Sequence, residues 1–124
     1  MQALLLIAHG SRRQSSNEEV LALTQVLASS PQNECRIMQC AFLELADPSI
    51  PDGVSACVQQ GASCVTVLPY FLSAGRHVVA DIPAELEKAK LMHPQIEIKV
   101  APYLGSASEI SDILIALSKK AASR

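Results

Sequence analysis

Residues 3–12 read Ala3-Leu4-Leu5-Leu6-Ile7-Ala8-His9-Gly10-Ser11-Arg12, and this stretch decides the fold class. Its first six residues are apolar without alternation, which is typical of a short strand buried on both faces, as in parallel sheets. The polar residues that follow at once predict a loop at the carboxyl end of that strand. Open α/β sheets bind their ligands at this edge. The stretch therefore predicts a parallel sheet with a polar site at one edge.

The same alternation of apolar strands and amphipathic helices continues to the end of the chain. Four βα units joined by right-handed crossovers predict an α/β fold with a single doubly wound, mainly parallel four-stranded sheet and helices on both faces. All four strand-to-helix loops then open on the same edge of the sheet. The predicted strands are residues 3–8, 35–42, 64–68 and 96–101.

Each predicted helix has a recognisable start. Capping boxes of the form Ser-x-x-Glu are typical of helix N-termini, as are Ser or Asp caps followed by proline in the first turn. The last helix carries an apolar stripe, Ile110, Ile113, Leu114 and Leu117, at helical spacing. The predicted starts are Ser15-x-x-Glu18, Ser49 before Pro51, Asp81 before Pro83, and Ser106-x-x-Glu109.

Length and charge restrict the class of protein. The 124 residues are 49% hydrophobic, which suits one compact domain over residues 1–124. A formal charge of −2 makes nucleic acid or an anionic membrane an unfavoured partner. The apolar runs are too short to span a membrane, and no basic segment with a cleavage pattern precedes them, so we expect a cytoplasmic protein.

The four cysteines do not predict a metal or disulfide site. Cys35, Cys40, Cys57 and Cys64 form no CxxC pair. Their spacing fits neither a zinc site nor a dense disulfide framework. We expect reduced residues in the core.

The strand-to-helix loops hold a candidate metal site. His9 and His77 follow the first and third strands, and Glu44 follows the second. Imidazole and carboxylate ligands suit cobalt, nickel, iron or zinc, and suit calcium or magnesium poorly. The spacing alone leaves open whether the histidines share a site, since histidine also caps helices and packs in cores. His93, before Pro94 at a helix end, is interpreted as structural.

Other loop residues allow several roles. Arg12, Arg13 and Arg76 can bind carboxylates or be solvated surface charges. Gly10 and Gly75 indicate positive φ or a close backbone approach. Tyr70 and Phe71 can stack on a flat ligand or pack in the core. No GxGxxG, P-loop or GxSxG motif is present, so nucleotide binding and serine hydrolysis are disfavoured.

Taken together, the loop motifs resemble a known family. The chain is similar to the short CbiX-type sirohydrochlorin chelatases, relatives of the ferrochelatase-like class II chelatases. The matching motifs come in the family's order and span most of the chain. They are His9-Gly10-Ser11-Arg12, the segment from Phe42 to Pro51, the segment from Val67 to His77, and Asp81-Ile82-Pro83.

The resemblance implies a chelatase-like fold and insertion of cobalt(II), or alternatively iron or nickel, into sirohydrochlorin. It implies His9 and His77 as metal ligands and His9 as proton acceptor, with Glu44 as ligand or proton relay. A neutral imidazole near the ring centre can present the ion and take a ring proton. Implied substrate contacts are Arg12, Asp47, Leu72, Ser73, Ala74, Gly75 and Arg76.

The resemblance also implies what accompanies the site. The metal is a substrate, and no tightly bound cofactor is expected. The cysteine-bearing extension of the long forms and the histidine-rich insert of some short forms are missing, so no iron–sulfur cluster is expected. Two-lobed relatives enclose the macrocycle, so a single lobe is expected to form a homodimer. A non-catalytic metal or tetrapyrrole carrier and a small regulatory α/β domain remain alternatives.

Overall fold

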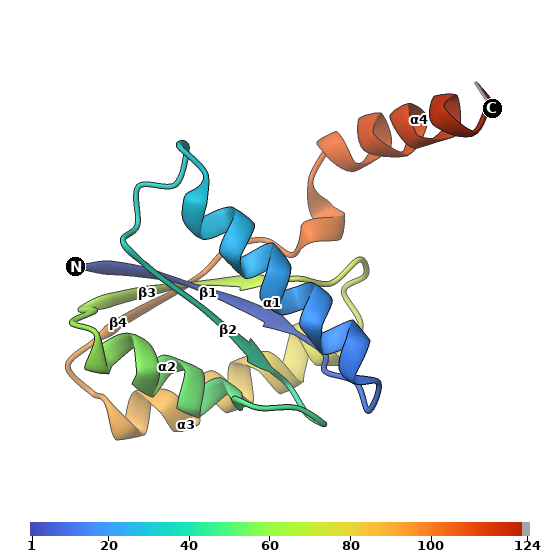
Figure 1. Ribbon diagram of the computed structural model, residues 1–124. Coiled ribbons are helices and arrows are strands. Elements are labelled where there is room, and N and C mark those ends of the chain that lie inside the picture. The colour runs from blue at the N-terminus through green and yellow to red at the C-terminus, as the bar shows by residue number, and fades with distance from the viewer. Residues whose placement is uncertain (123–124) are drawn as a thin grey trace.

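The computed structural model describes residues 1–122 and contains one parallel sheet, with strand order β2-β1-β3-β4. The predicted doubly wound α/β fold is thus confirmed (Figure 1). The strands are β1 (Gln2–Ala8), β2 (Ile37–Phe42), β3 (Cys64–Pro69) and β4 (Glu97–Val100). The helices are α1 (Gln14–Ser29), α2 (Ile50–Gln59), α3 (Ile82–Met92) and α4 (Glu109–Ala122), with a π turn η1 (His77–Asp81) and a 3-10 turn η2 (Leu104–Ser106).

The two faces of the sheet are covered unequally. Helices α2 and α3 lie side by side on one face, where the larger core includes Leu5, Ile50 and Ile82. Helix α1 lies on the other face, over a smaller core around Leu6 and Phe42 (Figure 1). Strands buried on both faces read as continuous apolar runs, as the sequence of β1 does. The crossovers leave β1 central, so its carboxyl end lies between those of β2 and β3.

The start of α1 differs from the prediction, whereas the start of α2 matches it. Ser15 lies inside α1, and the N-cap Arg13 provides no side-chain cap, so the predicted capping box was wrong. The buried Asn17 side chain instead bonds both backbone groups of Ser11, which fixes the loop before the helix. Helix α2 begins at Ile50, within the predicted segment, and the Ser49 hydroxyl accepts from the Asp52 amide at 3.3 Å.

The two later helix starts also correct the sequence interpretation. Helix α3 begins at Ile82 with Pro83 in its first turn, as predicted, but the Asp81 side chain does not cap it, because the Asp81 backbone is already helical (φ −72°, ψ −43°) and the chain enters α3 through the π turn. The Asp81 carboxylate bonds the His77 ring instead. Ser106 does not cap α4 either, because its hydroxyl donates to the Tyr103 carbonyl and α4 begins only at Glu109.

One cysteine lies outside the core. Strand β2 begins at Ile37 rather than at residue 35, because the Asn33 side chain accepts from the Cys35 amide and holds a turn there. Cys35 is consequently half-buried, whereas Cys40, Cys57 and Cys64 are buried. Burial raises the pKa of the Cys57 thiol to about 11. That thiol stays protonated near neutral pH and is a poor nucleophile or ligand.

Helix α4 extends away from the sheet (Figure 1). All of its residues are exposed except Ile110, which is half-buried. The apolar stripe predicted for this helix therefore exists but is not covered by the rest of the described chain. None of the helices within residues 1–122 is long and apolar enough to cross a membrane.

The pairing of β1 with β2 continues beyond both strands. The Leu43 amide donates to the Ala8 carbonyl at 2.9 Å, and the Glu44 amide donates to the His9 carbonyl at 3.0 Å. Gly10 makes this approach possible, with φ +94° and a Cβ position only 1.8 Å from the Glu44 carbonyl oxygen. Any side chain at residue 10 would push the two loops apart.

We predict that Gly10→Ala destabilises the protein by roughly 2–3 kcal/mol or more, because Ala adds left-handed strain and a clash with rigid backbone. Gly75→Ala is the matched control, since a Cβ there meets no atom of the described residues within 4 Å. It should change stability by less than about 0.5 kcal/mol. Denaturant unfolding of both variants is the measurement. Equal stability of the two would contradict the packing of Gly10 against the Glu44 loop.

Candidate metal centre

Three side chains from three separate loops converge at the carboxyl edge of the sheet. His9 follows β1, Glu44 follows β2, and His77 begins the π turn after β3. One ligand atom from each lies within 4.8 Å of the others. The sequence left open whether the two histidines share a site, and the structure brings them together. Their ring centroids are 4.6 Å apart.

A backbone contact orients His9. Its Nδ1 lies 3.0 Å from the Gly10 carbonyl oxygen, which can only accept, so Nδ1 is the donor. The other ring nitrogen, Nε2, faces Glu44 Oε2 at 2.9 Å. Both atoms are acceptors when the ring is neutral and the carboxyl is ionised. A hydrogen bond between them therefore needs one proton, at the place where a divalent ion would bind both groups.

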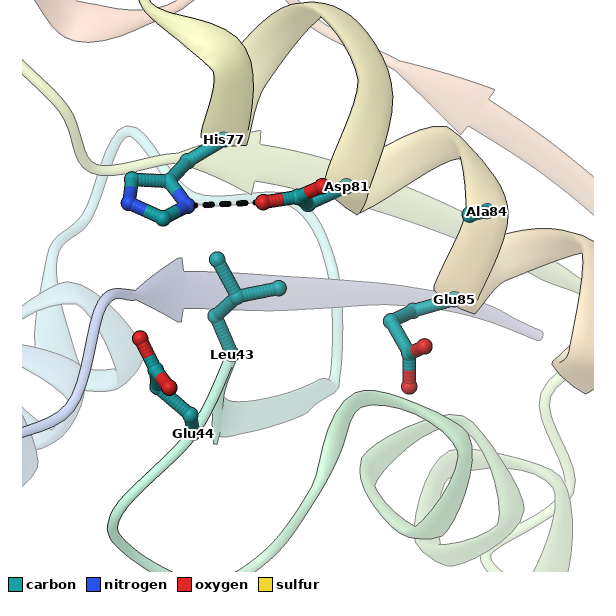
Figure 2. A pocket seen from close by; sticks show the side chains of 6 residues that line it. All are labelled: Leu43, Glu44, His77, Asp81, Ala84 and Glu85. Carbon is teal, nitrogen blue, oxygen red and sulfur yellow. Dashed lines mark hydrogen bonds and ion pairs between the residues drawn. The ribbon is translucent and has the colours of Figure 1, made fainter.

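A carboxylate orients His77. Its Nδ1 lies 2.8 Å from Asp81 Oδ2, one turn further along the chain, as the dashed line in Figure 2 shows. The bond leaves Nε2 of His77 available as a metal ligand. A carboxylate behind a metal-binding histidine fixes the ring and makes it a stronger ligand. Single-turn π segments are frequent at functional sites, and here the π turn positions both residues.

Sequence reasoning missed the role of Asp81. The spacing of four residues between His77 and Asp81 was a usable signal, but His77 was assigned to a loop and Asp81 to a helix cap. Four residues place two side chains on the same side of a helical turn. The π turn extends the helical backbone to His77.

The cluster is open to solvent. The exposed fractions of the side chains are 41% for His9, 52% for Glu44 and 43% for His77. The cavity beside them is about 270 Å³, which suits an ion with its waters better than a large ring. In Figure 2 the Glu44 carboxylate points toward His77, whereas Glu85 points away. The lining residues are Leu43, Glu44, His77, Asp81, Ala84 and Glu85.

The expected substrate contacts surround the cluster without joining it. Residues 72–76 form an exposed segment between β3 and the π turn. Arg12 and Asp47 line a separate hollow of about 360 Å³. Within residues 1–122 no carboxylate forms an ion pair with Arg12 or Arg76. These guanidinium groups are therefore available for anions from outside the chain.

Three further sequence interpretations have clear outcomes. Gly75 has neither positive φ nor a close neighbour among the described residues, so that interpretation was wrong for it. Phe71 packs against the core, whereas Tyr70 is 40% exposed. His93 ends α3 and bonds the Ser55 hydroxyl of α2 at 2.8 Å, in agreement with a structural role.

Comparisons with known proteins show the family of the chain. The CbiX family model matches residues 3–121. The chain belongs to the CbiX family. It is 33% identical to a sirohydrochlorin ferrochelatase of Priestia megaterium, over 93% of this chain and 42% of that protein. It is 29% identical to a sirohydrochlorin cobaltochelatase of Sulfolobus acidocaldarius, over 99% of this chain and 94% of that protein.

The fold likewise matches a solved CbiX-like structure. The sirohydrochlorin chelatase SirB from Bacillus subtilis subspecies spizizenii, in complex with cobalt, superposes with a TM-score of 0.87 and 31% identity. The match covers 96% of this chain and 50% of that one. The chain spans about half the length of the sirohydrochlorin ferrochelatases that it matches.

We predict that Asp81→Ala lowers the affinity for Co²⁺ by about 10- to 100-fold, because His77 loses the group that orients its ring. Asp81→Asn keeps an acceptor oxygen and should lose less. Glu85→Gln is the matched control, since Glu85 lines the same cavity but pairs with Lys88. Isothermal titration with Co²⁺ measures the three variants. Unchanged affinity in Asp81→Ala would show that Asp81 does not position the ligand.

Proposed function

We propose that this chain is a single CbiX-type domain that inserts a divalent metal ion into sirohydrochlorin. The preferred ion in this proposal is cobalt(II). The observation that carries the proposal is the convergence of His9, Glu44 and His77 at an open sheet edge, in a chain of the CbiX family. We also propose, from the sequence, that it acts in the cytoplasm and has no tightly bound cofactor.

The ligand set supports a metal ion that passes on to a substrate rather than one that stays bound to the protein. Two imidazole nitrogens and one carboxylate leave coordination positions open, and open positions permit exchange. Cobalt, nickel and iron all accept these ligands, so metal supply contributes to the choice. Cobalt is favoured because the sirohydrochlorin cobaltochelatase of Sulfolobus acidocaldarius matches this chain over 94% of its own length. Iron is the alternative, because two other relatives, 33% and 37% identical to this chain, are named sirohydrochlorin ferrochelatases.

Proton transfer follows from the same atoms. A tetrapyrrole loses its two inner N–H protons when a divalent ion enters, and each proton needs an acceptor. Once the ion has moved to the ring, His9 Nε2 and Glu44 are left without their metal partner. His9 Nε2, which lies 2.9 Å from Glu44 Oε2, can then accept the two ring protons one after the other and pass each to Glu44. His9 is the proposed proton acceptor and Glu44 the proposed relay to solvent.

Substrate binding is proposed at the rim of the site. Sirohydrochlorin carries peripheral carboxylates, which Arg12 and Arg76 can bind in bidentate fashion. The ring would lie across the mouth, against residues 72–76 on one side and Asp47 on the other. The cavity at the cluster would then admit only the ion and the waters bound to it.

We further propose that the active species is a homodimer. One chain covers a planar ring on a single face, whereas the curated ferrochelatases that it matches are about twice as long. Two copies related by a twofold axis can supply a second covering face without additional sequence.

The test is a visible-absorption assay with sirohydrochlorin and Co²⁺, Fe²⁺ or Ni²⁺ added separately. We predict that His77→Ala lowers the insertion rate by about 100-fold or more while the fold is retained, because a half-exposed ligand at the edge of the sheet contributes little to the core. His93→Ala is the matched control, since it removes a histidine that bonds only Ser55 in the described structure.

The outcomes separate the candidate functions. Insertion by the wild-type chain that is lost in His77→Ala supports the chelatase. Tight binding of metal or sirohydrochlorin without insertion would replace it with a carrier. Wild-type rates in His77→Ala would refute the proposed site, and the preferred ion among the three decides between cobalt, iron and nickel.

A further inference from the structure

Leu45 has an unusual backbone conformation. Within residues 1–122 it is the one residue other than glycine with positive φ, at 68°. Leucine rarely adopts this left-handed conformation, because its Cβ then lies too close to the following carbonyl oxygen. Leu43 packs against the larger core and Ala46 against the smaller one, whereas Leu45 belongs to neither and is 51% exposed. Burial therefore does not offset the strain, and glycine or asparagine would fit the turn with less.

The loop that contains Leu45 is held at both ends. On one side, the Glu44 amide donates to the His9 carbonyl at 3.0 Å. On the other side, the Phe42 amide donates to the Pro48 carbonyl at 2.8 Å. Strained residues persist where the surrounding structure determines their conformation, and they cluster at functional sites. The turn itself gives no reason for a leucine here, so we looked for a use of its side chain outside the core.

Leu45 links two parts of the candidate site. It directly follows Glu44, whose carboxylate points toward His77 (Figure 2). Its own side chain lines the separate hollow of about 360 Å³ to which Arg12 also contributes. An exposed apolar side chain thus follows a metal ligand in the chain and shares a hollow with a guanidinium group.

The backbone at Arg12 is fixed as well. The side chain of Asn17, a residue of α1 that is only 7% exposed, donates to the Ser11 carbonyl at 2.8 Å and accepts from the Ser11 amide at 3.0 Å. These two bonds hold the residue directly before Arg12. A ligand in the hollow therefore meets a positive charge and an apolar side chain that both extend from fixed backbone.

We infer that Leu45 is a substrate-binding residue whose side chain packs against the ring of sirohydrochlorin. The inference rests on the proposed function and deepens it by naming a contact that positions the ring. From its centre outward, this substrate has nitrogens that take the metal, an apolar ring system and peripheral carboxylates. The protein presents matching groups in the same order, namely the ligand Glu44, the apolar Leu45 and the guanidinium of Arg12. Glycine or asparagine would satisfy the turn but would leave the ring without this apolar contact.

Titration of the metal-free chain with sirohydrochlorin, followed by the fluorescence of the macrocycle, tests the contact. Leu45→Asn accepts positive φ and keeps a side chain of similar size, but it removes the apolar contact. It should raise the dissociation constant for sirohydrochlorin by about 10-fold or more, because a leucine side chain is no longer buried on binding. Leu45→Met keeps an apolar side chain and should stay within about threefold of the wild type.

Two further measurements separate substrate binding from a structural role. Leu45→Asn should unfold at the same or a higher denaturant concentration than the wild type, because it relieves the left-handed strain. It should also bind Co²⁺ as tightly as the wild type, since the three metal ligands are unchanged. Leu91→Asn is the matched control, because Leu91 is a 78% exposed leucine near the end of α3. It should leave the affinity for sirohydrochlorin unchanged.

Each outcome decides the inference. Weaker binding of sirohydrochlorin by Leu45→Asn, with stability and Co²⁺ affinity retained, supports it. Equal affinities of Leu45→Asn and a wild type that binds sirohydrochlorin would overturn this inference alone. Lower stability together with lower Co²⁺ affinity would overturn it in favour of a structural role. A wild type that binds no sirohydrochlorin would refute the proposed function and the inference with it. Leu45→Gly, which also accepts positive φ, takes the place of Leu45→Asn if the latter does not fold.

Discussion

The hydrogen bond from the Glu44 amide to the His9 carbonyl, 3.0 Å long, holds the candidate site together. It extends the parallel pairing of β1 and β2 beyond both strands, so the register of the sheet determines where His9 and Glu44 meet. Gly10 allows the approach, and the Gly10 carbonyl in turn orients the His9 ring. A site built on strand ends in this way inherits the rigidity of the buried sheet, although its side chains are half-exposed.

Much of the fold and part of the site could be predicted from the sequence. Continuous apolar runs and helical stripes identified the strands and helices because burial imposes these periods. Parallel topology then placed His9, Glu44 and His77 at one edge. The cap motifs predicted for α1 and α4 were wrong, since Ser15 and Ser106 do not occupy a cap position, whereas α3 begins where predicted but without a side-chain cap from Asp81. The pairing of Asp81 with His77 was missed because the four-residue spacing brings the two side chains together only if the backbone is already helical at His77.

The protein has a well-buried core and two apolar surfaces that the described chain leaves exposed. On one face, α2 and α3 bury the sheet; on the other, α1 leaves a groove open, and α4 carries its apolar stripe into solvent. The side chains of the metal cluster are likewise 41–52% exposed. These exposed surfaces support the proposed homodimer, as does the greater length of the sirohydrochlorin ferrochelatases that the chain matches.

The central claim is that His9, Glu44 and His77 bind one divalent ion together. Isothermal titration of the wild-type chain and of Glu44→Gln with Co²⁺ tests it most directly. The account predicts one ion per chain, with an affinity about 10-fold or more lower in Glu44→Gln, because a neutral amide is a weaker ligand than a carboxylate. Absence of binding by the wild-type chain, or equal affinities of Glu44→Gln and the wild type, would contradict it.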